Sequence, residues 1–109
     1  MQTPMVPPVS HLQALTLGTL VGADQPGTRI RDVMAEHGVK RTLAAFYQLM
    51  ARLERDGLVE GRYQLVHVGD QTVTERWYRL TPAGVRAWNR TRAFYQALAA
   101  AADRRWSRA

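Results

Sequence analysis

The spacing of apolar residues changes at Leu58. Before this residue, apolar side chains recur three and four residues apart, which predicts amphipathic helices over residues 11–21, 29–36 and 43–56. Between residues 58 and 80, Val, Tyr, Thr and Trp predominate and Gly69-Asp70 interrupts them, which predicts two strands joined by a hairpin turn. Thr81-Pro82 is a strong helix start and predicts a last helix over residues 82–106. This order of elements indicates a mainly α (α+β) fold.

The second and third predicted helices are joined by a short turn that contains Gly38, as in a helix-turn-helix. The pair of strands that follows is in the position of the wing in a winged-helix fold. We therefore expect a winged helix-turn-helix with a two-stranded wing over residues 10–81 and a long C-terminal dimerisation helix over residues 82–109. Residues 1–9 contain three prolines and are expected to form a disordered arm. Helix N-caps are predicted at Ser10, Thr28 and Thr42.

Charge indicates a polyanionic partner. The 109 residues are enough for one domain and carry a formal net charge of +6, and no Lys or Arg precedes residue 28. Nucleic acid is the first candidate partner, an anionic membrane surface is the second, and a merely basic surface is the alternative. The absence of cysteine is compatible with a reducing cytoplasm. No apolar run approaches the ~20 residues of a membrane-spanning helix. We expect a cytoplasmic protein that does not bind membranes.

The third predicted helix has the pattern of a DNA-reading helix. Its apolar residues face a core, and its opposite face has small residues near the start, which allow close approach to the major groove. Gln48 is suited to adenine and Arg52 to guanine, unless Arg52 pairs with Asp56 one turn away. The residues before the helix and its free N–H groups are suited to a phosphate, as is the Tyr47 hydroxyl.

In the predicted hairpin, the candidate phosphate contacts are Arg62, His67, Arg76 and Arg79, and Arg62 and Arg76 are favoured over His67. Trp77 and Tyr78 are adjacent and must point to opposite faces of the strand, and we expect Tyr78 in the core. The complete set of candidate DNA-binding residues is Lys40, Arg41, Thr42, Ala45, Tyr47, Gln48, Arg52, Arg62 and Arg76.

The last predicted helix has two neighbouring apolar stripes, wider than a domain of this size can cover. A second copy of the chain is the expected cover, because twofold dimers are the commonest oligomers. The alternative is that the helix folds back onto its own core. The candidate dimer-interface residues are Trp88, Thr91, Tyr95, Leu98 and Ala102.

Two segments carry a family resemblance. Residues 46–59, read as FYQLMARLERDGLV, resemble the signature of the PadR family, in which a Leu-rich helix with a Tyr leads into Arg-Leu-Glu and then acidic-Gly-Leu. Residues 77–84, WYRLTPAG, are similar to the Tyr-Tyr-x-Leu-Thr-x-x-Gly of that family. The Arg-Leu-Glu part is shared with other winged-helix families such as MarR, whereas Tyr47 and Leu-Thr-x-x-Gly discriminate better. The resemblance covers residues 11–98, and the single last helix resembles the shorter PadR subfamily.

The resemblance implies a dimeric repressor of transcription that binds double-stranded DNA and is often released by a small aromatic or cationic effector. It also implies effector contacts on the last helix, at Trp88, Phe94 and Tyr95, although aromatic residues there are also explained by packing alone. Two segments depart from the family pattern. Gly27-Thr28-Arg29 replaces its His-Gly-Tyr, and Thr42-Leu43-Ala44-Ala45 replaces its Ser-Pro-Gly-Thr.

Catalytic groupings are not recognisable in the sequence. The three histidines fall on separate predicted elements, and the glycines do not form a phosphate-binding loop. We therefore expect no metal, no cofactor and no enzyme activity. The alternative function is a winged helix that acts as a protein-interaction or architectural module without sequence-specific promoter binding.

Overall fold

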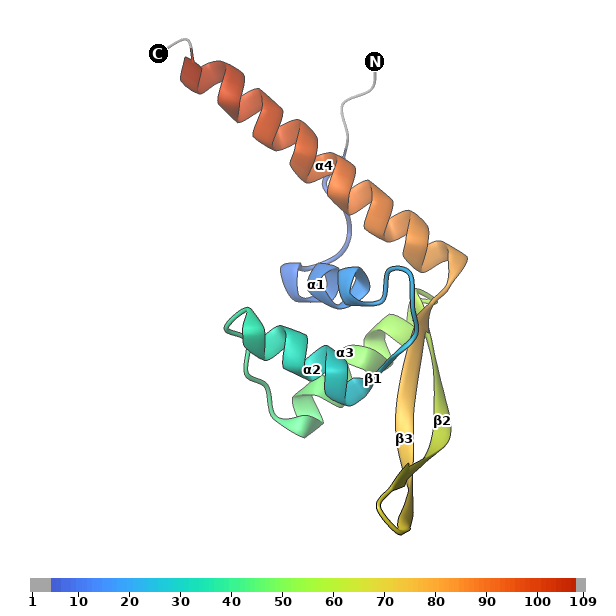
Figure 1. Ribbon diagram of the computed structural model, residues 1–109. Coiled ribbons are helices and arrows are strands. Elements are labelled where there is room, and N and C mark those ends of the chain that lie inside the picture. Colours follow the sequence, from blue (N-terminus) through green and yellow to red (C-terminus); the bar gives the residue numbers. More distant parts are fainter. Residues whose placement is uncertain (1–4, 108–109) are drawn as a thin grey trace.

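The computed structural model describes residues 5–107 and has the predicted order of helices and strands, with one short strand added (Figure 1). The elements are α1 (His11–Thr19), β1 (Gln25–Pro26), α2 (Gly27–Glu36), α3 (Leu43–Arg55), β2 (Val59–Val68), β3 (Gln71–Leu80) and α4 (Pro82–Ser107). The fold is a winged helix of four helices and a small antiparallel sheet, as the sequence predicted.

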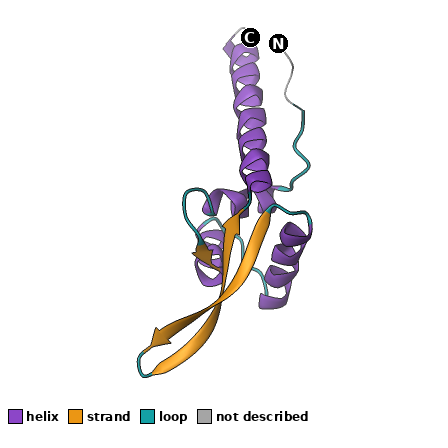
Figure 2. Ribbon diagram, turned by 90° about the vertical axis from the view of Figure 1, so that its right-hand side faces the viewer, coloured by secondary structure: helices purple, strands orange, loops and turns teal. Residues whose placement is uncertain are grey.

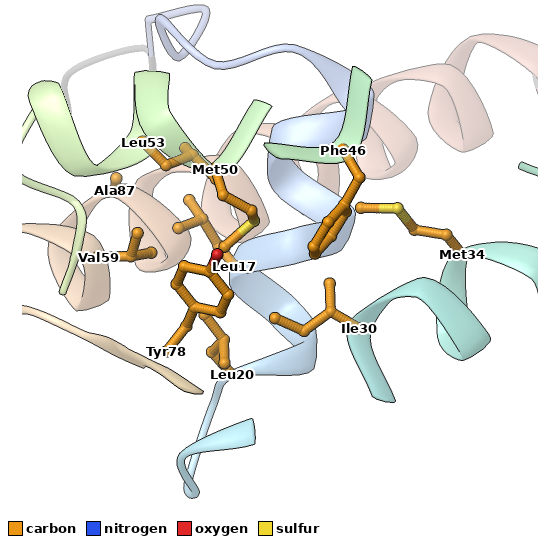
Figure 3. Close-up of a cluster of buried hydrophobic side chains, with 10 residues drawn as sticks. All are labelled: Leu17, Leu20, Ile30, Met34, Phe46, Met50, Leu53, Val59, Tyr78 and Ala87. Carbon is orange, nitrogen blue, oxygen red and sulfur yellow. The ribbon is translucent and has the colours of Figure 1, made fainter. Parts of the chain in front are cut away.

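The hydrophobic core lies where α1, α2 and α3 meet the base of the sheet (Figure 3). Leu17 of α1 is fully buried at its centre, as expected for a central helix. The core residues are Leu17, Leu20, Ile30, Met34, Phe46, Met50, Leu53, Val59, Tyr78 and Ala87. Tyr78 is buried and Trp77 only partly so, which confirms the predicted orientation of this strand.

Two predicted helix ends were wrong by two residues, and the predicted ends of α3 and α4 each differ from the structure by one residue. The first helix stops at Thr19 instead of reaching residue 21, and Val21 is half exposed. The second begins at Gly27, so Thr28 lies inside the helix and is not its cap. The reason is strand β1, where Gln25 and Pro26 pair with Tyr78 and Trp77 of β3 and hold the backbone extended up to the first residue of α2. The predicted caps at Ser10 and Thr42 are confirmed.

The hairpin of β2 and β3 extends from the body on the side away from α4 (Figures 1 and 2). The strands pair without interruption from Val59 opposite Leu80 to Val68 opposite Gln71. Gly69 has a φ of +61°, the left-handed conformation that a two-residue hairpin turn requires. Because side chains alternate between the two faces of a strand, Tyr63, Arg76 and Tyr78 share one face, and Arg62 and Trp77 share the other.

The base of the wing is joined to the start of α4 by a compact set of contacts. The Thr81 hydroxyl donates to the Gly57 carbonyl (2.6 Å) and accepts from the Gly84 N–H (3.0 Å), so it caps α4 and fixes it to the end of α3. The Thr81 N–H donates to the Leu58 carbonyl (3.1 Å). Gly84 is buried against this same carbonyl, and any side chain there would overlap it. The Leu-Thr-x-x-Gly motif is therefore the connector between wing and last helix.

Helix α4 contains 26 residues, about 39 Å at 1.5 Å per residue. Its first half packs on α1 with Ala87 and Thr91 buried, and its second half runs beyond the body (Figure 1). Trp106, near its end, is 85% exposed. In the described part of the chain, no helix is long and apolar enough to cross a membrane.

The predicted arm over residues 1–9 is described only from residue 5 onward, and residues 1–4 lie outside the described range. Within it, Pro7 is buried and Val9 packs against the edge of the core, whereas Met5 and Val6 are exposed.

Candidate nucleic-acid interface

Helix α3 has one buried and one exposed face, as its spacing predicted. Phe46, Met50 and Leu53 are buried in the core. The opposite face carries exposed side chains at Ala44, Gln48, Ala51, Arg52 and Arg55. Small residues lie at the N-terminal end of this face, and the longer side chains of Gln48 and Arg52 lie further along it. A helix with such a face can enter the major groove of DNA.

Arg52 does not form the ion pair that was the alternative to a role in binding. Asp56, four residues later, contacts Arg55 instead, at 3.6 Å. Among the residues that the structure describes, neither Arg52 nor Gln48 has a side-chain hydrogen bond, and both are exposed. Their donors and acceptors are therefore free for a ligand such as a base edge.

The N-terminal end of α3 adds positive charge. Lys40, Arg41 and Thr42 are exposed, and Ala45 is partly buried. The Thr42 hydroxyl is already used, because it accepts the Ala45 N–H at 3.1 Å and caps the helix. Arg31 of α2 joins this group, since it donates to the Arg41 carbonyl at 3.3 Å. Sequence reasoning missed Arg31, because no local spacing indicates a contact between residues ten positions apart.

Tyr47 lies on the flank of α3 that faces the wing, at the edge of the exposed face. Its side chain is about half exposed, and its ring is 5.7 Å from that of Phe46. It lines a small cavity of about 140 Å³ together with Thr74 and Arg76 of β3. The tyrosine hydroxyl therefore has access to solvent between the helix and the wing.

The two favoured wing arginines lie on opposite faces of the hairpin, so the structure does not bring them together. Arg62 lies on the outer face, where its Nη1 donates to Asp24 Oδ2 (2.8 Å) and its guanidinium is 5.7 Å from the Trp77 ring centre. Arg76 lies on the inner face and turns toward α3, where its Nη2 donates to Glu54 Oε1 (3.0 Å). The two arginines therefore do not form one basic surface, because Arg76 is directed toward α3 and Arg62 lies on the opposite face of the hairpin.

The surroundings of Arg76 strengthen its charged state. Burial opposes the charge, but the hydrogen bond and negative charge of Glu54, with a smaller effect of Tyr78, raise the pKa of Arg76 above its ordinary value. Burial also raises the pKa of Tyr78, against the effect of the nearby Arg76. Arg79 on the outer face pairs with Glu60, and this partner raises the pKa of Arg79.

The candidate dimer residues of α4 divide into covered and exposed ones. Thr91 is 3% exposed and donates to the Ala87 carbonyl (2.7 Å), so its own chain covers it, whereas Trp88 packs over Gly18 of α1 and is partly buried. Tyr95 and Leu98 are 42% and 52% exposed, and Ala102 is exposed as well.

An open apolar groove of about 700 Å³ lies between α1 and α4. Trp88 and Tyr95 line it, with Leu15 and Gly18 on the α1 side and Arg92 and Gln96 further along α4. Phe94 is not part of its lining, but its ring meets that of Tyr95 edge-on at 5.2 Å. Two of the three candidate effector residues therefore share one groove. Across residues 5–107, no three His, Asp or Glu side chains gather as a metal site would require.

No family model and no curated protein sequence matches the chain. Solved structures do match, and several are described as PadR family regulators. One from Clostridium difficile R20291 has a TM-score of 0.73 and 16% identity, with 87% of this chain and 97% of that chain covered. One from Eggerthella lenta has a TM-score of 0.65 and 26% identity, over 85% and 79% of the two chains. Bacillus subtilis PadR in complex with operator DNA has a TM-score of 0.62 and 19% identity, over 75% and 46%.

Most of the matching structures cover at least 85% of this chain, which is more than the winged-helix part alone. Their likeness to this chain therefore includes at least part of the long last helix and is not restricted to the helix-turn-helix that many regulators share. The chain has the PadR-like winged-helix fold.

Proposed function

We propose that this protein is a dimeric, sequence-specific regulator of transcription that binds double-stranded DNA. The observation that carries the proposal is the exposed face of α3, on which Gln48 and Arg52 are free of partners in the described structure. A neighbouring fold, Bacillus subtilis PadR, was solved with operator DNA, which supports DNA as the ligand of such a face.

In the proposed complex, α3 enters the major groove, with Gln48 reading adenine and Arg52 reading guanine. Ala45 allows close approach, and Lys40, Arg41 and the backbone at Thr42 hold a phosphate at the start of the helix. Tyr47 contacts the DNA backbone beside α3, and Arg62 contacts it from the outer face of the wing. Arg62 must then exchange its exposed ion pair with Asp24 for a phosphate, which costs little because such pairs contribute about 1 kcal/mol or less.

A homodimer would bring two copies of α3 to two half-sites about one DNA turn apart, roughly 34 Å. The support for a dimer is the exposed apolar surface of α4 at Tyr95, Leu98 and Ala102, next to the groove between α1 and α4. Burying this surface against a second copy removes apolar area from water. Leu98→Glu is expected to convert the dimer to a monomer in sedimentation measurements, and an unchanged dimer would contradict this interface.

The same groove is the proposed site of an effector, a planar aromatic compound that contacts Trp88 and Tyr95. Its apolar lining and volume support a small aromatic ligand. Such a compound should quench tryptophan fluorescence in the wild-type protein and lose this effect in Trp88→Phe. Release of the protein from an operator on addition of the same compound would support a repressor. The absence of any response across a broad panel would remove the effector from the proposal.

Selection of bound duplexes from a random library tests the central proposal. Enrichment of a palindrome with half-sites about one turn apart is expected for a sequence-specific dimer. On the enriched duplex, Arg52→Ala should weaken binding about tenfold or more, with a smaller effect on unrelated duplexes. Lys40→Ala should weaken binding to both and reduce the salt dependence by about one phosphate contact.

Arg90→Ala is the matched control, because Arg90 is also an exposed arginine but lies on α4, away from α3. It should bind the enriched duplex like the wild type. If no sequence is enriched, or if Arg52→Ala and Arg90→Ala bind equally well, sequence-specific recognition by α3 is refuted. The outcome would then favour a winged helix that contacts other proteins or packages DNA without reading it.

A further inference from the structure

An ion pair links the candidate DNA-reading helix to the wing. Glu54 near the end of α3 and Arg76 in the middle of β3 are 22 residues apart in sequence, and their carboxylate and guanidinium are 3.0 Å apart. Their side chains are 31% and 25% exposed, whereas those of the Glu60–Arg79 pair on the outer face are both more than half exposed. The Glu54–Arg76 pair is thus the more shielded of the two and lies between two structural elements.

The space that the pair occupies is shaped for it. Gly61 of β2 lies directly beneath it, and a methyl group there would overlap the Glu54 carboxylate and lie 2.6 Å from Arg76 Nη2. The guanidinium is 4.7 Å from the ring centre of Tyr63 and 5.7 Å from that of Tyr78, distances at which an aromatic ring attracts a cation. Side chains from α3, β2 and β3 therefore meet at this one point.

The hairpin needs such a fixing point. Its strands have ten residues each, about 33 Å, and their outer halves have few contacts with the body (Figures 1 and 2). The core anchors only its base, through Val59 and Tyr78. The Glu54–Arg76 pair holds the strands to α3 further out, so it influences the angle between the wing and the helix.

We propose that Glu54 and Arg76 are positioning residues, which fix the wing relative to α3, and that Arg76 is not a phosphate contact. The inference rests on the proposed DNA binding by α3 and the wing, and it concerns how the two parts are held in register on one duplex. Specific binding requires this register, because each element must reach its own part of the site.

Removal of the Glu54 carboxylate distinguishes a phosphate contact from a positioning role, because the two roles of Arg76 predict opposite changes in DNA affinity. If Arg76 contacts phosphate, Glu54→Ala frees a cation and removes a repelling charge, so DNA binds more tightly and with a steeper salt dependence. If the pair positions the wing, Glu54→Ala weakens binding to the enriched duplex. The expected loss of affinity is about fivefold, which corresponds to the contribution of one partly exposed ion pair. The salt dependence is then unchanged, because no phosphate contact is lost.

Glu60→Ala is the matched control, since it also removes a carboxylate paired with an arginine of β3, but on the outer face. It is expected to leave binding to the enriched duplex unchanged or slightly tighter. Glu54→Gln, which keeps the shape of the side chain, serves if Glu54→Ala does not fold. Tighter or unchanged binding of the Glu54 variants, or a change equal to that of Glu60→Ala, would overturn the proposal.

A second measurement needs no DNA and separates this proposal from the proposed function. The chain has no cysteine, so spin labels can be placed at Ala51→Cys on α3 and Gln71→Cys at the wing tip, with unlabelled chains added in excess. The distance distribution between the labels should broaden or shift in Glu54→Ala and Gly61→Ala, and not in Glu60→Ala. Identical distributions in all variants would refute the positioning role. Failure of the wild type to enrich any duplex would refute the proposed function and leave this result to decide the role of the pair.

Discussion

Replacement of Gly84 by alanine tests the connector between the wing and α4. Gly84 is buried, and an added methyl group would overlap the carbonyl oxygen of Leu58 and lie 3.1 Å from its carbon. This neighbour is backbone and cannot rotate away. It also accepts the Thr81 N–H, so a displacement of the carbonyl weakens a hydrogen bond at the same junction.

Two opposing effects determine the size of the change. Alanine favours a helix over glycine by about 1 kcal/mol. Overpacking a tight site costs about 1–3 kcal/mol, and the upper end applies where backbone must move. We therefore expect Gly84→Ala to lower the free energy of unfolding by about 2 kcal/mol, which corresponds to a Tm lower by about 8 °C for a domain of this size.

Gly18→Ala is the matched control, because it is the same substitution in another helix of the same protein. Its methyl group would lie 2.8 Å from Cη2 of Trp88, the far end of a side chain that borders the open groove, and a side-chain ring can give way more easily than backbone. The gain in helix propensity then offsets the crowding, and stability should change by less than about 1 kcal/mol. Urea and thermal denaturation measure both variants. If Gly84→Ala is as stable as Gly18→Ala, the reasoning about the Leu58 carbonyl is refuted.

Two further predictions concern stability. Thr42→Ala removes the side-chain acceptor of the Ala45 N–H and should lower the free energy of unfolding by about 1 kcal/mol in urea denaturation, with Thr28→Ala, which removes no cap, as its control. Burial raises the pKa of Tyr78 above the value near 10 of an unfolded chain, so the folded state holds this proton more tightly. The contribution of the Tyr78 proton to the free energy of unfolding is complete below about pH 10 and is lost as the pH rises through the folded-state pKa. In Tyr78→Phe, the free energy of unfolding should therefore decline less steeply at alkaline pH.

Much of the fold was predictable because it follows from local rules. The change of spacing at Leu58, the caps at Ser10 and Thr42 and the start of α4 at Pro82 depend on residues within a few positions of one another. The orientation of Tyr78 follows from strand alternation alone. Strand β1 was not predictable, because two residues have no period of their own and adopt an extended form only through pairing with β3.

The candidate site, like the fold, was predictable only in part. The sequence by itself determined which side chains share the exposed face of α3, because the helical period places Gln48 and Arg52 opposite Phe46 and Met50. Only the tertiary structure decided the partner of each charge. Arg76 turns toward Glu54 and Thr91 is covered by its own chain, because these contacts depend on how elements distant in sequence pack together, and no local pattern encodes that arrangement.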